Sequence, residues 1–202
     1  MNNKALSILI SFLLLVTGVV NAQIGDQTSI GPRIGVNFSN VSNVEGSESL
    51  TGLVLGLTST YSISEKTGLT VDLLYSAEGY TLDGNDLHLN YLQIPIYFDL
   101  FFGELGSKFR PKVYAGFAPG FLLNAKNNDV KVDKGNFNSV NFALSGGLGF
   151  NYRLASRVWL NTDLRAFLGL NDIRKESFQS GDKNANNTVQ LSLGVAYGLS
   201  KI

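Results

Sequence analysis

Eight charged side chains recur at alternating positions within apolar stretches of this 202-residue chain, and they are its most obvious candidates for chemistry. Four are cations and four are acids. Equal numbers suit mutual pairing in a confined interior, where an unpaired charge costs several kcal/mol. The spacing therefore predicts ion pairs, and no pair among them has a hydrolase-like setting. The residues are Arg33, Lys112, Arg153 and Arg165, and Asp72, Glu78, Asp99 and Asp163.

The single histidine gives little support for catalysis. A hydrolase that modifies lipid needs a nucleophile, a base and an orienting acid within hydrogen-bond reach. His88 is expected at the outer end of an extended segment, on its outward side or in a loop, with no Ser and Glu beside it. We interpret it as an interfacial histidine and expect no catalytic residue in the chain.

Metal and cofactor sites are not expected either. One histidine and no cysteine cannot build a zinc site, and a calcium loop needs closely spaced oxygen ligands. Asn127-Asn128-Asp129 and Asp182-Lys183-Asn184 are typical of solvated turns. Gly146-Gly147-Leu148-Gly149 resembles a phosphate-binding loop, but no helix follows it. We therefore predict no metal ligand, no cofactor-binding residue and no cofactor.

The elements that carry these residues are β-strands, because apolar and polar residues alternate along most of the chain. Residues 91–102 read YLQIPIYFDLFF, and every even position from 92 to 100 is apolar. Phe101 and Phe102 end the stretch. Pro95 removes a ladder hydrogen bond, so we expect a bulge at or next to it. Eight strands are predicted, at about 29–39, 51–63, 68–79, 91–102, 110–124, 139–154, 157–169 and 188–200.

The connections alternate in length. Those after the first, third, fifth and seventh predicted strands are polar and mostly long, whereas the others are shorter. This organisation is typical of outer-membrane barrels, whose short turns lie on the periplasmic side. Both termini then lie in the periplasm, and five charged residues fall toward that end, where we expect a paired polar plug. They are Arg33, Asp72, Asp99, Lys112 and Arg153.

Composition bounds the location of the chain. Lys plus Arg and Asp plus Glu both number 16, so no polyanion such as nucleic acid is an expected partner. Lys4, an apolar run and Val20-Asn21-Ala22 form the pattern of a secretory signal peptide, expected at 1–22 and cleaved before Gln23. An uncleaved transmembrane helix is the alternative. Residues 23–202 are expected to form one barrel domain.

Alternation alone leaves the orientation open, because a soluble barrel also has one apolar and one polar face. Only 16% of the residues are charged, and the polar faces are crowded with Gly, Ala, Ser, Asn and Thr. A solvated exterior runs about 25–35% charged, whereas the narrow interior of eight strands suits small residues. We predict that the apolar faces contact lipid and that polar side chains fill the lumen.

Several strands resemble the PorT-like outer-membrane β-barrel family of the Bacteroidota. Tyr91-Leu92-Gln93-Ile94-Pro95-Ile96 is similar to its Y-L-E-I-P-L strand, with Gln93 in place of the usual acid. Val113-Tyr114-Ala115-Gly116, Gly147-Leu148-Gly149-Phe150 and residues 163–173 are similar to later strands of the family. The resemblance implies an eight-stranded outer-membrane barrel, and the best-known member assists a protein-secretion apparatus.

These observations predict an all-β, eight-stranded, antiparallel up-and-down transmembrane barrel in the outer membrane. A non-enzymatic structural or secretion-accessory role leads. A lipid-modifying enzyme, a small-solute channel and a surface adhesion module remain as alternatives. Expected partners are outer-membrane lipids, the barrel-insertion machinery and protein-secretion components. The insertion machinery is included because Ser192-Leu193-Gly194-Val195-Ala196-Tyr197-Gly198-Leu199 resembles the signal it recognises in a last strand.

Overall fold

The computed structural model describes residues 28–128, 130–175 and 184–199. The expected signal peptide at 1–22 lies outside these residues. The described part contains ten strands and one 3-10 helix, η2. Their bounds are β1 Thr28–Val41, β2 Glu48–Ser62, β3 Thr67–Leu82, β4 Asn85–Gln93, β5 Ile96–Phe101, β6 Phe109–Asn127, β7 Val130–Val132, η2 Lys134–Asn136, β8 Val140–Ala155, β9 Val158–Gly169 and β10 Asn186–Gly198.

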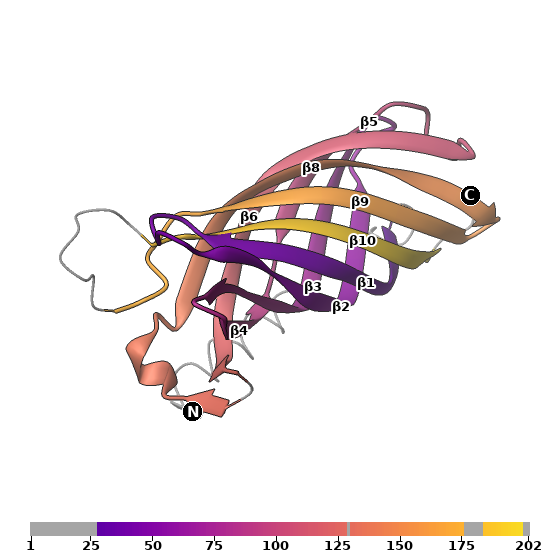
Figure 1. The fold of residues 1–202 in the computed structure, drawn as a ribbon. Helices are drawn as coiled ribbons and strands as arrows, with labels where there is room; N and C mark the ends of the chain where they lie inside the picture. Colours follow the sequence, from indigo (N-terminus) through magenta and orange to yellow (C-terminus); the bar gives the residue numbers. More distant parts are fainter. Residues whose placement is uncertain (1–27, 129, 176–183, 200–202) are drawn as a thin grey trace, which may run out of the picture.

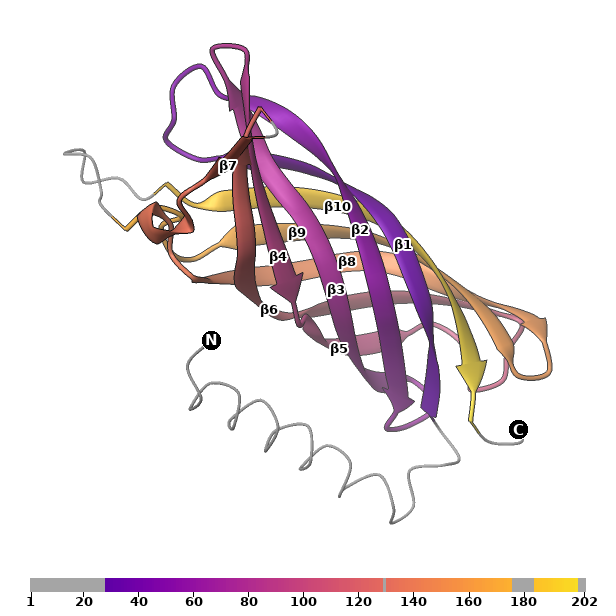
Figure 2. The ribbon, with the colours of Figure 1, turned by 90° about the horizontal axis from the view of Figure 1, so that it is seen from below.

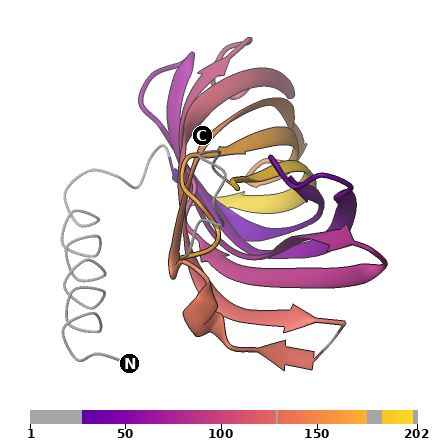
Figure 3. The ribbon, with the colours of Figure 1, turned by 60° about the vertical axis from the view of Figure 1, so that its left-hand side comes forward.

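The strands form a closed antiparallel ring (Figure 1). β1 pairs with both β2 and β10, so the first and last strands of the chain close the sheet. β4 and β5 both lie between β3 and β6 and act as two halves of one strand. The ring is thus the predicted eight-stranded up-and-down barrel, seen wrapped around its interior in Figure 3.

Two features extend the predicted elements at the outer end. The fourth strand begins at Asn85, not at Tyr91, because Asp83 and Gly84 form a two-residue turn with φ of 51° and 72°. Positive φ at both positions is what a tight hairpin turn requires. The short strand β7, which pairs with the end of β6, and the 3-10 helix η2 were not predicted.

The bulge expected at Pro95 is wrong. Gln93 and Ile96 keep the same register with β3, opposite Leu74 and Val71 respectively. The Asp72 N–H donates to the Pro95 carbonyl at 3.0 Å, so the strand loses only the bond that proline cannot donate. The register shift lies earlier, between Asn90 and Tyr91 against β6.

The apolar faces of the strands point away from the barrel interior, as predicted. Phe98 and Leu100 are 50% and 45% exposed, whereas Tyr97 and Asp99 between them are buried. The same alternation runs along β10, where Leu191 and Leu193 are exposed and Gln190 and Ser192 are buried. These outward rows give the barrel an apolar band of the kind that contacts lipid.

The two ends of the barrel differ. Thr28 and Leu199 are joined by a backbone hydrogen bond of 2.8 Å, which places the start of β1 beside the end of β10. The short turns after β2, β5 and β8 lie at this end, and the connections after β1, β6 and β9 lie at the other (Figure 2). Among the described residues, no helix has the length and hydropathy needed to cross a membrane.

The filled lumen as candidate functional site

Six charged side chains meet inside the barrel. They come from five strands, and all six are buried. We call them the ionic cluster: Arg33, Lys112 and Arg165 with Asp72, Asp99 and Asp163. Three cations face three acids, so the cluster is balanced. The strands β1, β3, β5, β6 and β9 bring these residues together because each presents them on its inward face.

Asp163 is the most connected acid of the ionic cluster. Its carboxylate lies 2.5 Å from Arg33 Nη1, 3.0 Å from Lys112 Nζ and 3.7 Å from Arg165 Nη2. Asp72 in turn bridges two cations, at 2.5 Å from Arg165 Nη1 and 3.5 Å from Arg33 Nε. Asp163 and Asp72 therefore link all three cations into one connected network.

Neutral side chains complete the ionic cluster. Thr70 donates a hydrogen bond of 2.7 Å to Asp99, and Arg33 donates one of 2.8 Å to Ser192. The Arg165 guanidinium lies 4.8 Å from the centre of the Tyr97 ring and 5.6 Å from that of Tyr114. Rings at such distances attract a cation over their faces. Charges and rings thus fill the cross-section of the lumen.

The prediction of ion pairing is confirmed for six of the eight charged residues. Arg33, Asp72, Asp99 and Lys112 lie in the halves of their strands nearer the short turns, where the polar plug was expected. Arg153 does not join it: the guanidinium lies 5.9 Å from the Trp159 ring centre instead. Among the described residues no cation pairs with Glu78 either.

Arg110 is a buried lumen residue that the sequence analysis did not single out. Its side chain lies 4.1 Å from the centre of the Phe101 ring and donates a hydrogen bond of 2.7 Å to the Glu65 carbonyl. Arg110 shares the parity of Lys112 in the same strand. That parity was the available signal, and it also marks Leu122 of the same strand as an inward residue.

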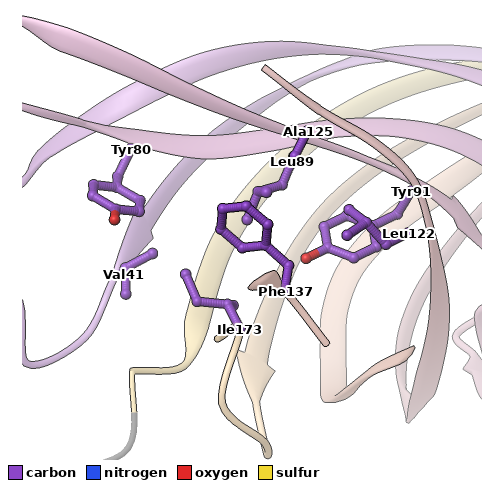
Figure 4. Close-up of a cluster of buried hydrophobic side chains, with 8 residues drawn as sticks. All are labelled: Val41, Tyr80, Leu89, Tyr91, Leu122, Ala125, Phe137 and Ile173. Atoms are coloured by element: carbon purple, nitrogen blue, oxygen red, sulfur yellow. The ribbon is translucent and has the colours of Figure 1, made fainter. Parts of the chain in front are cut away.

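The outer part of the lumen is apolar, which corrects the expectation of a wholly polar filling. Eight buried side chains pack together there (Figure 4). Six come from the barrel wall, and Phe137 and Ile173 come from the connections after η2 and β9. We call this set the apolar plug: Val41, Tyr80, Leu89, Tyr91, Leu122, Ala125, Phe137 and Ile173.

The two long connections are tied to each other across the apolar plug. The Asn138 amide group donates to the carbonyls of Asp172 at 2.7 Å and Arg174 at 3.2 Å. Its backbone N–H donates to Ile173 at 2.9 Å, and Phe137 forms an isolated bridge with Arg174. These bonds hold Phe137 and Ile173 over the barrel mouth, so the outer end is closed by packed apolar side chains.

His88 lies on the outward side of β4, as predicted, with Gly79 and Lys126 as its strand partners. Its inward neighbour Leu89 belongs to the apolar plug.

Within the described part of the chain, no group of three or more His, Cys, Asp or Glu residues could hold a metal ion. Asn128 connects the end of β6 to the start of β4, since its side-chain oxygen accepts a hydrogen bond from the Asp86 N–H at 2.9 Å. The predicted turns that include Asp129, Asp182 and Lys183 lie outside the described residues.

A pocket of about 500 Å³ lies beside the apolar plug and shares Phe137 with it. Its wall is apolar at Leu87, Val132 and Phe137, and two cations, Arg174 and Lys175, line the same pocket. Arg174 is held in place by a hydrogen bond of 3.1 Å from its guanidinium to the Tyr80 hydroxyl. The pocket combines apolar surface with positive charge.

The sequence and the fold are similar to those of known outer-membrane proteins. Residues 21–175 match a family model described as outer membrane protein beta-barrel domain. No curated protein matches the chain.

Two solved structures share the fold. The structure of Neisserial surface protein A is 15% identical in sequence, with a TM-score of 0.62, and the match covers 85% of this chain and 96% of that one. Ail, the attachment invasion locus protein of Yersinia pestis, solved with the heparin analogue sucrose octasulfate, is 12% identical with a TM-score of 0.50. That match covers 85% of this chain and 98% of Ail. At these identities the likeness concerns the fold alone.

Proposed function

Because the chain belongs to the outer membrane protein beta-barrel domain family and lies in the outer membrane, we propose that it is a closed, non-enzymatic barrel with a structural or secretion-accessory role. One observation carries the proposal: the ionic cluster and the apolar plug fill successive parts of the lumen. A filled lumen offers no continuous water path for a solute. The task of the protein then falls to its surfaces.

A conductance measurement tests the closed lumen. The purified, folded barrel inserted into a planar lipid bilayer should give no discrete conductance steps. The double replacement Phe137→Ala and Ile173→Ala removes apolar plug residues but leaves the ionic cluster below them, so it should stay closed as well. Regular conductance steps in the unchanged protein would contradict the proposal and favour a small-solute channel.

The non-enzymatic part of the proposal rests on the setting of His88. The residue faces outward beside Gly79 and Lys126, and among the described residues no nucleophile or acid is hydrogen-bonded to its ring. Replacing His88 by Ala in cells should leave the lipid A profile unchanged by mass spectrometry. A lost lipid A modification, with normal barrel levels in the outer membrane, would favour a lipid-modifying enzyme.

The proposed partners use different surfaces. Lipids cover the outward apolar rows, and the insertion machinery reads the last strand, where Tyr197 is 48% exposed on the outward face. Secretion components are the proposed partners of the two ends of the barrel. Cross-linking in cells followed by identification of the attached proteins, together with secretion assays in a deletion strain, tests this role. A deletion strain with normal secretion and no cross-linked secretion component would contradict it.

A surface binding module is the second candidate, and the pocket beside Arg174 and Lys175 favours it. Positive charge next to apolar surface suits an anionic ligand. If this function holds, replacing both cations by Ala should reduce the attachment of cells to a surface coated with an anionic ligand. Attachment equal to that of the unchanged protein would speak against it.

A further inference from the structure

Glu78 is a buried carboxylate without a partner cation. It lies on β3 and is only 3% exposed. Among the described residues, no Lys or Arg lies within ion-pair distance of it, and its contacts are all to neutral groups. The ionic cluster cannot compensate it, because the three cations there already face three acids. Arg110, the other buried cation of the lumen, lies against the Phe101 ring and the Glu65 carbonyl. The charge of Glu78 is therefore not compensated within its own layer.

Three neutral side chains donate hydrogen bonds to this carboxylate. Ser76 Oγ donates at 2.8 Å and Gln93 Nε2 at 2.5 Å, both to Oε1. Asn186 Nδ2 donates to Oε2. The three donors come from β3, β4 and β10, so the carboxylate is held from both sides of the barrel interior.

The oxygens of the surrounding amide groups have no donors of their own. Gln93 Oε1, Asn186 Oδ1 and Gln190 Oε1 are buried and without a hydrogen-bond partner. In Gln93 and Asn186 the oxygen belongs to the same amide group as the nitrogen that binds Glu78, so both amide groups lie against the carboxylate. Gln190 lies four residues along β10 from Asn186, about 13 Å away, and its amide nitrogen donates to Asn37 at 3.1 Å. Its oxygen is therefore separate from the other two.

The layer around Glu78 thus has too many acceptors and one charge too many. Asn37 completes it by donating to Ser76 Oγ at 2.8 Å, which directs the serine hydroxyl toward the carboxylate. Leu89 of the apolar plug is the strand partner of Glu78, so the surroundings on that side are apolar. Burying an unpaired charge and unsatisfied acceptors is unfavourable, and a small cation would correct both.

We propose that this layer binds one monovalent cation, with sodium as the physiological class, through Glu78 and the amide oxygens of Gln93 and Asn186. Hard cations prefer carboxylate and carbonyl oxygen ligands. A single carboxylate is neutralised by a single positive charge, whereas a divalent ion would leave the buried site with a net positive charge. The proposal goes beyond the structural or secretion-accessory role.

Thermal unfolding of the folded barrel in detergent tests the site. Sodium chloride is compared with choline chloride at equal concentration, so that ionic strength and chloride are matched. A cation that binds only the folded state raises the Tm progressively with its concentration. We expect a sodium-specific rise of Tm in the unchanged protein and the loss of this rise in Glu78→Gln. Sodium-23 line broadening by the unchanged protein, absent for Glu78→Gln, gives the second readout.

Two further variants separate the site from general effects. Glu104→Gln removes an exposed carboxylate from a short turn and should keep the full sodium response. Gln93→Met retains the carboxylate but removes one amide oxygen, so it should weaken the response, and it keeps the test open if Glu78→Gln does not fold. Equal Tm values in sodium and choline would overturn the proposal and leave Glu78 as a protonated acid. A calcium-specific rise without a sodium response would overturn the monovalent assignment.

Discussion

At the scale of single residues, Asp163 decides the charge balance of the lumen. It is the one acid of the ionic cluster that lies within 4 Å of all three cations. Arg33 and Arg165 also contact Asp72, and Lys112 also contacts Asp99, but each of these contacts serves only part of the network. Buried ion pairs add little net stability when intact, yet removing one partner leaves an uncompensated charge.

Asp163→Asn should therefore lower the free energy of unfolding by about 3–5 kcal/mol, because three buried cations would face two acids. Urea unfolding followed by the mobility of unheated samples on a denaturing gel measures the change. Glu104→Gln is the control, since it removes an exposed carboxylate. A loss as small as that of the control would show that water reaches the ionic cluster freely.

The apolar plug makes a second prediction for one residue. Phe137 is 6% exposed and packs among wall residues of the lumen. Phe137→Ala should cost about 3–5 kcal/mol, the usual loss for a large aromatic side chain removed from a core. Phe102, 61% exposed in a short turn, provides the control, and Phe102→Ala should cost much less. Similar losses for the two variants in urea unfolding would mean that the plug is not packed.

At the scale of the elements, inward glycines set how closely neighbouring strands approach. In β6 a Cβ atom on Gly116 would lie 1.9 Å from the Ile96 carbonyl oxygen. A Cβ on Gly120 of the same strand would come no nearer than 3.4 Å, to Gln93 Cγ. The first position therefore has no room for a side chain and the second has nearly enough.

Gly116→Ala should destabilise the barrel by about 1–3 kcal/mol, because β5 and β6 must move apart to accept the methyl group. Gly120→Ala in the same strand should be close to neutral. Both are measured by the temperature at which the folded band is lost on a denaturing gel. Equal losses of stability in the two variants would indicate that the intrinsic backbone preference of alanine causes them, and not the contact with Ile96.

At the scale of the whole molecule, closure and the outward apolar band fit the chain to a membrane. Lipid offers no hydrogen bonds, so a spanning sheet must pair all its strands, and the β1–β10 pairing achieves this. Leu193 lies near the middle of its strand and is 49% exposed, whereas Leu154 is 55% exposed at the end of β8 beside a short turn.

Leu193→Arg should cost about 2–4 kcal/mol and Leu154→Arg about 0–1 kcal/mol, because the penalty for a charge on the lipid face falls from the midplane to the interface. Folding into lipid vesicles, followed by urea unfolding, measures both. If the two variants lost the same stability, the barrel would sit in the bilayer differently from the orientation described above.

The strands and the orientation of their faces can be predicted from the order of residues alone. A period of two separates the faces of Leu92 and Gln93 within a few residues, and small residues on one face exclude a solvated exterior. The family resemblance to PorT-like barrels predicted the same architecture. The match to the wider outer membrane protein beta-barrel domain family agrees with this architecture.

Which inward residues contact one another depends on the folded barrel. Arg33 and Asp163 lie 130 positions apart in the chain, and their contact depends on the tilt and stagger of the whole ring. The same stagger places Arg153 on Trp159 and leaves Glu78 without a cation among the described residues, although alternation alone gives all of them the same inward direction. Height along the barrel axis is a property of register across eight strands, so no single strand encodes it.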